Sequence, residues 1–142
     1  MRSQTLLLCA AAAAATFATA SLAASPVETV VLEPIASSVK GTATVGVAGT
    51  GTTARARFAL TGVRPGALVR AVVQAGSCKR PSASLAAAGA ARATAAGKAR
   101  WSARVSIAGR LVSWIAIADG DHVVTVISDG HAAACAAIPG MS

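Results

Sequence analysis

The chain has few large side chains from which to build a core. It contains no tyrosine, and aromatic residues make up 3% of its 142 residues. Alanine supplies much of the 54% hydrophobic content, and an alanine side chain buries little apolar area. The length suits one domain, so we expect a core of small residues that a covalent cross-link would help to stabilise.

Acidic residues are also scarce, with five against thirteen lysines and arginines and a formal net charge of +8. The two glutamates, Glu28 and Glu33, lie near the N-terminus and do not form a paired-carboxylate site. No serine lies in a Gly-x-Ser-x-Gly motif, and no glycine-rich loop precedes a helical pattern. The basic excess is typical of a soluble extracellular protein or of one attracted to anionic polymers or membranes. The arginine and alanine content also favours a GC-rich, bacterial genome.

The N-terminus has the pattern of a secretory signal. A positive end at Met1-Arg2 precedes an apolar run from Leu6 to Ala15, which is too short to anchor a protein in a bilayer. Small residues follow, and we expect cleavage between Ser21 and Ser25. The sequence therefore predicts a signal peptide over 1–24, a single domain over 25–142, and a secreted or extracytoplasmic location.

Cysteine is rare, and its positions predict one disulfide. Cys9 lies inside the apolar run of the signal and would be removed with it. Cys78 and Cys135 remain, an even count in an exported chain. A bond between them would close a loop of about 57 residues, for which the chain-entropy estimate is roughly 4 kcal/mol.

After the signal, the apolar pattern is that of strands and not of helices. The clearest alternation places Ala54, Ala56, Phe58 and Leu60 on one face, and Ala99, Trp101, Ala103, Val105 and Ile107 on another. Residues 76–97 are mostly small, which predicts a long loop with a helical turn around Ser84 to Ala88. About eight short strands separated by turn signals predict an all-β antiparallel sandwich or barrel. The expected runs are 27–32, 42–48, 53–60, 67–75, 98–107, 111–118, 123–128 and 132–138.

Four short motifs follow one another in order between Thr42 and Ile138. They are Leu60-Thr61-Gly62 with Gly66, Gly76-Ser77-Cys78, Gly97-Lys98-Ala99, and Ala134-Cys135-Ala136-Ala137-Ile138. In this order, and with the cysteines so placed, they resemble copper–zinc superoxide dismutase. The resemblance implies a Greek-key sandwich of the immunoglobulin-like and superoxide dismutase-like type. The framework is also similar to that of the chordin-like secreted domains, a metal-free alternative.

The metal ligands that this resemblance implies are missing. The family's His-x-His pair falls on Ala71-Val72-Val73, its later copper histidine falls near Thr125, and its guiding arginine falls on Ala132. The loop over 76–97, where zinc ligands are expected, contains neither histidine nor aspartate. In this family copper needs imidazole ligands to cycle between its two oxidation states, and alanine and valine do not supply them. We therefore expect the fold without the reaction: no enzyme activity and no cofactor.

An alternative hypothesis is a copper/zinc superoxide dismutase-type metalloenzyme with non-standard ligands. His122, His131 and Asp121 are its candidate ligands, with Asp119 and Asp129 nearby. These residues lack a recognised ligand spacing. Asp-Gly is also common turn chemistry, so hairpin turns explain the same residues.

Basic residues are the remaining functional signal. Those predicted to point outward from the strands are Arg55, Arg57, Arg70, Lys98, Arg100 and Arg104. On one sheet they would form a basic face, although a solvated surface explains them as well. The expected function is a secreted, non-catalytic superoxide dismutase-like domain, structural or binding weakly to an anionic cell-surface polymer or lipid. Nucleic acid is not an expected partner, because that face carries no aromatic residue on which bases could stack.

Overall fold

The computed structural model describes residues 27–47, 51–83 and 86–140. The expected signal peptide and its cleavage site lie outside the described residues. Strands make up nearly all of the regular structure, with one four-residue helix, α1 (Trp114–Ile117). The strands are β1 (Val27–Pro34), β2 (Lys40–Val47), β3 (Ala54–Thr61), β4 (Leu68–Ala75), β5 (Ala86–Arg92), β6 (Ala99–Arg104), β7 (Ser106–Ile107), β8 (Arg110–Leu111), β9 (His122–Ser128) and β10 (His131–Ile138).

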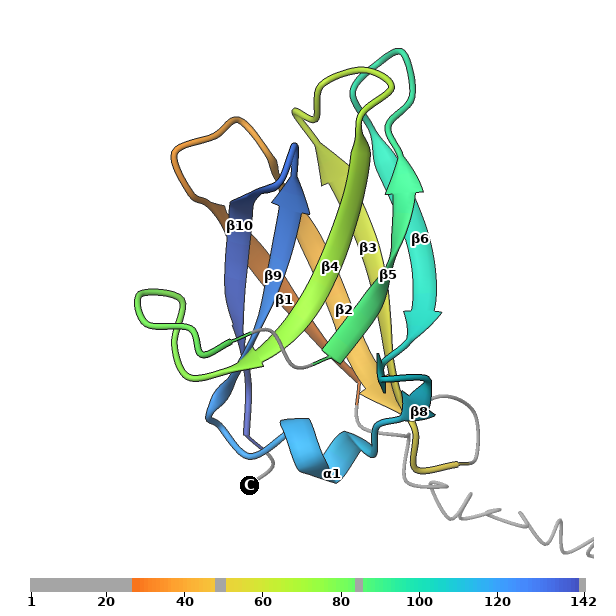
Figure 1. Cartoon of the computed structure of the whole chain (residues 1–142), viewed down its shortest axis with the longest axis vertical. Helices are drawn as coiled ribbons and strands as arrows, with labels where there is room; N and C mark the ends of the chain where they lie inside the picture. Colours follow the sequence, from red (N-terminus) through yellow and green to blue (C-terminus); the bar gives the residue numbers. More distant parts are fainter. Residues whose placement is uncertain (1–26, 48–50, 84–85, 141–142) are drawn as a thin grey trace, which may run out of the picture.

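All strands pair antiparallel in one sheet that folds over on itself into a nearly closed barrel (Figure 1). Its order is β6-β3-β2-β1-β10-β9-β4-β5-β7-β8. We call β6, β3, β2 and β1 the first sheet, and β10, β9, β4 and β5 the second. At the seam between β5 and β6, Trp101 Nε1 donates a hydrogen bond to the Ala88 carbonyl at 2.9 Å. The all-β antiparallel prediction is confirmed, with 10 strands in place of about eight.

The core lies between the two sheets and consists mostly of alanine and valine. The alternation predicted along β3 is confirmed, because its four inward residues are at most 2% exposed: Ala54, Ala56, Phe58 and Leu60. The largest of them, Phe58, stacks on Trp101 with 4.5 Å between ring centroids. The continuous apolar run of β9 is buried on both faces, since Val123, Val124, Thr125 and Val126 are all buried.

The helical turn expected around Ser84 to Ala88 is wrong for its described part. Ser84 lies outside the described residues, but Ala86 to Ala88 belong to β5, where Ala86 pairs with Val73 and Ala87 with Val72. Alanine has a high helix propensity, but that preference amounts to less than about 1 kcal/mol per residue. Hydrogen-bonded pairing of β5 with the edge of β4 outweighs this helix preference, because the small side chains of β5 fit against the neighbouring strand.

The chain also departs from the expected pattern after β6. The alternation predicts that Ile107 points inward with Val105, but Ile107 is 45% exposed. The backbone leaves the first sheet after Val105 and turns through the short β7–β8 ribbon. Of the apolar run over 111–118, which was predicted as a strand, Leu111 ends β8 and residues 114–117 form α1 instead, with the i, i+3 pair Trp114 and Ile117 buried. This three-residue spacing matches one helical face, which the sequence interpretation missed.

Two glycines of the β3–β4 connection provide a matched test of this architecture. Gly62 and Gly66 have φ values of 73° and 76°, which disfavour any other residue. A Cβ at Gly62 would overlap the Ser38 carbonyl, whereas a Cβ at Gly66 would meet nothing within 4 Å. We expect Gly66→Ala to cost about 1–2 kcal/mol from the backbone alone, and Gly62→Ala clearly more. Urea unfolding of both variants measures the difference, and equal losses would contradict this packing.

Candidate functional site

The predicted disulfide is present. Cys78, in the exposed loop after β4, is bonded to buried Cys135 on β10, with 5.9 Å between the Cα atoms. The bond is compatible with an extracytoplasmic location. Beside it, between β1 and β10, lies a mostly apolar hollow of about 630 Å³. Its charged lining residues are Glu33 and Lys79, which do not form a catalytic group with the bonded cysteines.

The positions where the resemblance would place copper ligands do not converge. Ala71 and Val73 are buried in the core between the sheets. Thr125 pairs directly with Val72, so its side chain lies on the opposite side of the second sheet. Histidines at these three positions could not bind one ion together.

A hydrogen-bond chain occupies the outer side of the second sheet near the disulfide. Thr125 Oγ1 donates to Gln74 Oε1 at 2.8 Å, and Gln74 Nε2 donates to the Ser82 carbonyl at 2.9 Å. It links β9 and β4 to the loop that carries Cys78. Sequence reasoning missed this chain. The alternation of β4, which places Gln74 with Val72 opposite Thr125, was the signal that could have revealed it.

The candidate ligands His122 and His131 lie at opposite ends of the β9–β10 hairpin. His131 pairs with Ser128, and His122 pairs with Ile138. The length of β9, roughly 20 Å at 3.3 Å per residue, therefore separates them. His122 Nδ1 lies 2.7 Å from Asp119 Oδ1, and this hydrogen bond is the main reason why the pKa of Asp119 is below its usual value. The Asp119 carboxylate also accepts a hydrogen bond from the backbone N–H of Asp121, as expected of a turn.

Within residues 27–47, 51–83 and 86–140, no three His, Cys, Asp or Glu side chains come together as metal ligands. In the same part of the chain, no helix has the length and apolar character needed to cross a membrane.

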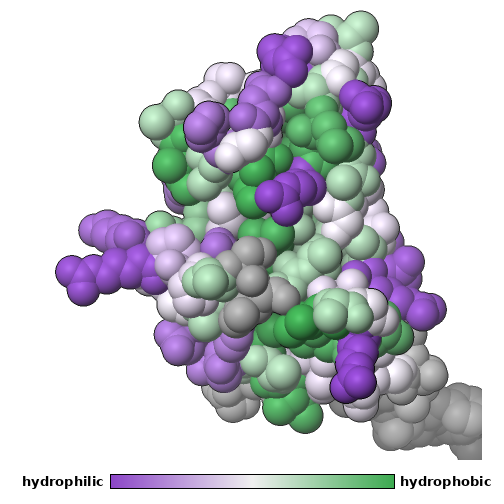
Figure 2. Space-filling view, in the orientation of Figure 1, coloured by the Kyte–Doolittle hydropathy of each residue, from purple (hydrophilic) through white to green (hydrophobic). Residues whose placement is uncertain are grey.

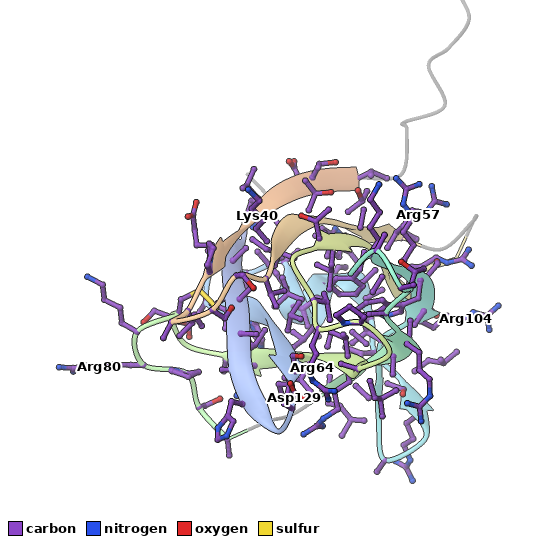
Figure 3. The ribbon with its side chains drawn as sticks, turned by 90° about the horizontal axis from the view of Figure 1, so that it is seen from above. Lys40, Arg57, Arg64, Arg80, Arg104 and Asp129 are labelled. Carbon is purple, nitrogen blue, oxygen red and sulfur yellow. A yellow bond between two sulfur atoms is a disulfide. The ribbon has the colours of Figure 1, made fainter. Side chains whose placement is uncertain are left out.

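Four of the predicted basic residues do share one surface. Arg55 and Arg57 on β3, and Arg100 and Arg104 on β6, all point outward from the first sheet. Lys98, which is exposed, immediately precedes β6. We call these five residues the basic face. Figure 3 shows Arg57 on the side of the molecule formed by the first sheet.

The register places like charges directly opposite one another. Arg55 pairs with Arg104, and Arg57 pairs with Ser102. Arg55 Nε donates to Ser102 Oγ at 3.0 Å, which holds one guanidinium over the sheet. Cβ atoms of directly paired residues lie about 5 Å apart, a spacing at which like charges are destabilising. The register therefore concentrates positive charge on one surface of the first sheet.

Two shallow hollows run along this face. One, of about 250 Å³, is lined by Arg55, Arg57, Ser102, Thr44 and the buried Gly46, among others. The other, of about 270 Å³, shares Arg57, Ser102 and Thr44 with the first and adds Arg100. Gly46 pairs with Arg55 and has no side chain, which leaves space beside that guanidinium. Guanidinium and hydroxyl groups thus line two adjoining hollows, which we together call the groove, and neither lining contains an acidic residue.

Arg70 does not belong to the basic face, which corrects the sequence prediction. It lies on β4 in the second sheet, where it pairs with Ile127. Its exposed position follows from the alternation of β4, but the sequence did not indicate that β3 and β4 belong to different sheets. Arg70 instead lies with Arg64 and Arg92 around a separate hollow.

A scan against protein-family models and searches of curated proteins and of solved structures found no match to this chain.

Proposed function

We propose that the protein is a secreted, non-catalytic domain that binds an anionic cell-surface polymer through the basic face. The observation that carries this proposal is the arginine register over the groove. Arg55 and Arg104 are opposed, and Arg57 and Arg100 continue the same surface beside the hydroxyls of Thr44 and Ser102. Guanidinium groups bind carboxylate and sulfate oxygens in a forked geometry, and hydroxyls can donate to the same oxygens.

Several contacts have to act together for such binding to be measurable. The basic-face side chains are exposed, and an exposed ion pair contributes about 0–1 kcal/mol and is screened over about 8 Å at physiological salt. A polymer with repeated negative groups can contact several arginines at once. Along β3, Arg55 and Arg57 are two residues apart, or about 7 Å, and Arg100 and Arg104 are about 13 Å apart along β6.

The first sheet favours a soluble polymer over a lipid bilayer. The outward-pointing residues that line either hollow are small, hydroxylated or basic, apart from Val27 at the start of β1, which lines the first hollow. Buried Phe58 stacks on half-buried Trp101, whose Nε1 is bonded to the Ala88 carbonyl, so both rings are held by the protein and neither is placed to insert into a membrane or to stack on a base. The groove therefore suits contacts with charged groups and lacks the apolar anchor that stable bilayer binding needs.

The fold type that we propose for this domain is the superoxide dismutase-like sandwich. β4, β5 and β6 follow one another around the barrel, and β3 lies beside β6 although the chain runs from β3 to β4. This connection supports a Greek-key assignment. Copper–zinc superoxide dismutase shares the sandwich architecture with many cell-surface domains that lack sequence similarity. The side chains of Ala71 and Val73 lie on the opposite side of the second sheet from that of Thr125, so ligands at these positions would not meet at one ion. This arrangement supports a domain of this type that does not catalyse the dismutation of superoxide.

Retention on an acidic polysaccharide column tests the binding proposal. We expect the protein expressed from Ser25 to elute at clearly higher salt than its Arg100→Glu, Arg104→Glu variant, because two contacts become repulsive. The matched control is Lys79→Glu, Arg80→Glu, which changes the net charge equally in the exposed disulfide loop. Equal elution of the two variants would mean that net charge alone determines retention, and the basic face would have no special role.

Metal analysis separates the proposal from the metalloenzyme alternative. After incubation with copper or zinc and dialysis against metal-free buffer, we expect no stoichiometric metal in the protein and no acceleration of superoxide loss beyond buffer. The control is the variant His122→Ala, His131→Ala. One tightly held equivalent of metal in the parent that disappears in this variant would overturn the non-catalytic assignment.

A further inference from the structure

A second basic cluster lies on the opposite side of the sandwich, on the second sheet. Arg64 in the β3–β4 turn, Arg70 on β4 and Arg92 at the end of β5 surround a hollow of about 370 Å³. We call these three residues the second cluster. Figure 3 shows Arg64 together with Asp129 on the side away from Arg57. Figure 2 views the second sheet and shows hydrophilic side chains around its upper end, with apolar surface between them.

Two of the three guanidinium groups are held in place by the protein. Arg64 forms a forked ion pair with Asp129, with Nη2–Oδ1 at 2.7 Å and Nε–Oδ2 at 3.3 Å. This contact is the main reason why the pKa of Asp129 lies below its usual value. Arg92 Nη1 donates to the Gly66 carbonyl at 3.3 Å. Arg70 has no ion pair in the described part of the chain, so the cluster keeps an excess of positive charge.

The hollow has room for an anionic group. Gly66 and Gly130 line it, and a Cβ at either position would meet no atom within 4 Å, so the space beside them is open. Arg70 is flanked by Ala90 on β5 and by Ile127 on β9, neither of which neutralises it. A carboxylate or sulfate could therefore contact Arg70 and Arg92 while Arg64 stays paired with Asp129.

We propose that the second cluster is a second binding site for the same anionic polymer and that the domain bridges two polymer chains. This inference rests on the proposed function of the basic face. The two sites belong to opposite sheets and point away from each other, so one short oligosaccharide cannot occupy both. A single domain with both sites occupied would cross-link polymer strands, and double attachment to a surface would strengthen binding by avidity.

Two charge-reversal variants with equal net charge test the inference. The basic-face variant is Arg57→Glu, Arg100→Glu, and the second-cluster variant is Arg70→Glu, Arg92→Glu. The probe is a sulfated heparin tetrasaccharide, titrated calorimetrically at low salt. Bridging is measured as recruitment of labelled heparin to heparin-coated beads. Arg→Gln versions of both variants and their melting temperatures control for loss of folding.

We expect two tetrasaccharides per parent chain and one per chain of either variant. Bridging should fall by at least roughly tenfold in both variants, because each retains a single site. One tetrasaccharide per parent chain, or full bridging by the second-cluster variant, would overturn the inference and leave the basic face intact. If the basic-face variant still bound as many tetrasaccharides per chain as the parent while the second-cluster variant bound fewer, the basic face would not be a binding site. The proposed function itself would then fail.

Discussion

Replacing Cys78 with alanine is expected to lower the melting temperature of the protein expressed from Ser25 by roughly 10–20 °C. The bond joins residues 57 apart in sequence and therefore restricts a large loop of the unfolded chain. The corresponding stabilisation is about 4 kcal/mol, a large share of the total for a domain of this size. The effect should be large here because the core has so few bulky side chains. Scanning calorimetry under oxidising conditions measures the change.

The exposed neighbour Lys79 provides the control for this substitution. Lys79→Ala should leave the melting temperature within about 2 °C of the parent, since a surface change of this kind is usually worth less than 0.5 kcal/mol. The parent in reducing buffer should melt at the temperature of the Cys78→Ala variant. Labelling of both cysteines by a thiol reagent in the native, oxidised protein would show that the bond is absent.

The second large effect is expected at Phe58, a large core side chain that is 1% exposed. Phe58→Ala should reduce the free energy of unfolding by about 3–5 kcal/mol, because it removes the stack on Trp101 and leaves a cavity among small residues. The same change would loosen Trp101, whose Nε1 hydrogen bond to Ala88 joins β6 to β5 at the seam. Chemical denaturation followed by Trp fluorescence measures both consequences.

Phe58→Leu is the matched control, because it keeps an apolar side chain of similar reach at the same position. It should cost clearly less than Phe58→Ala. A loss below about 1 kcal/mol for the alanine variant would mean that the surrounding residues can collapse into the space, and that the core does not depend on this ring.

The sequence predicted the strand pattern well where alternation was strong. Along β3, arginine alternates with alanine and phenylalanine, so period two identifies both the strand and its buried face. Alanine-rich β5 has no such contrast between its faces, and its assignment depends on pairing with β4 that no local pattern reports. Trp114 and Ile117 show a similar limit, because a single i, i+3 pair matches a helical face but is too little to distinguish a helical turn from a strand.

The candidate site could be predicted only in part, because residue lists do not reveal which strands share a sheet. Arg57 and Arg100 were correctly placed on outward faces, and the structure brings their strands together. Arg70 satisfied the same alternation rule but lies on the other sheet, with Arg64 and Arg92. His122 and His131 are close in sequence, yet the extended hairpin separates them by the length of a strand.

The most direct test of the basic face is a residue-resolved titration. Heparin tetrasaccharide is added to the ¹⁵N-labelled protein expressed from Ser25, and amide shifts are followed by NMR at low and at physiological salt. We expect saturable shifts at Arg55 to Arg57 on β3 and at Ser102 to Arg104 on β6, weakened strongly by salt because the contacts are exposed. An absence of shifts on β3 and β6 at low salt would contradict the proposed function.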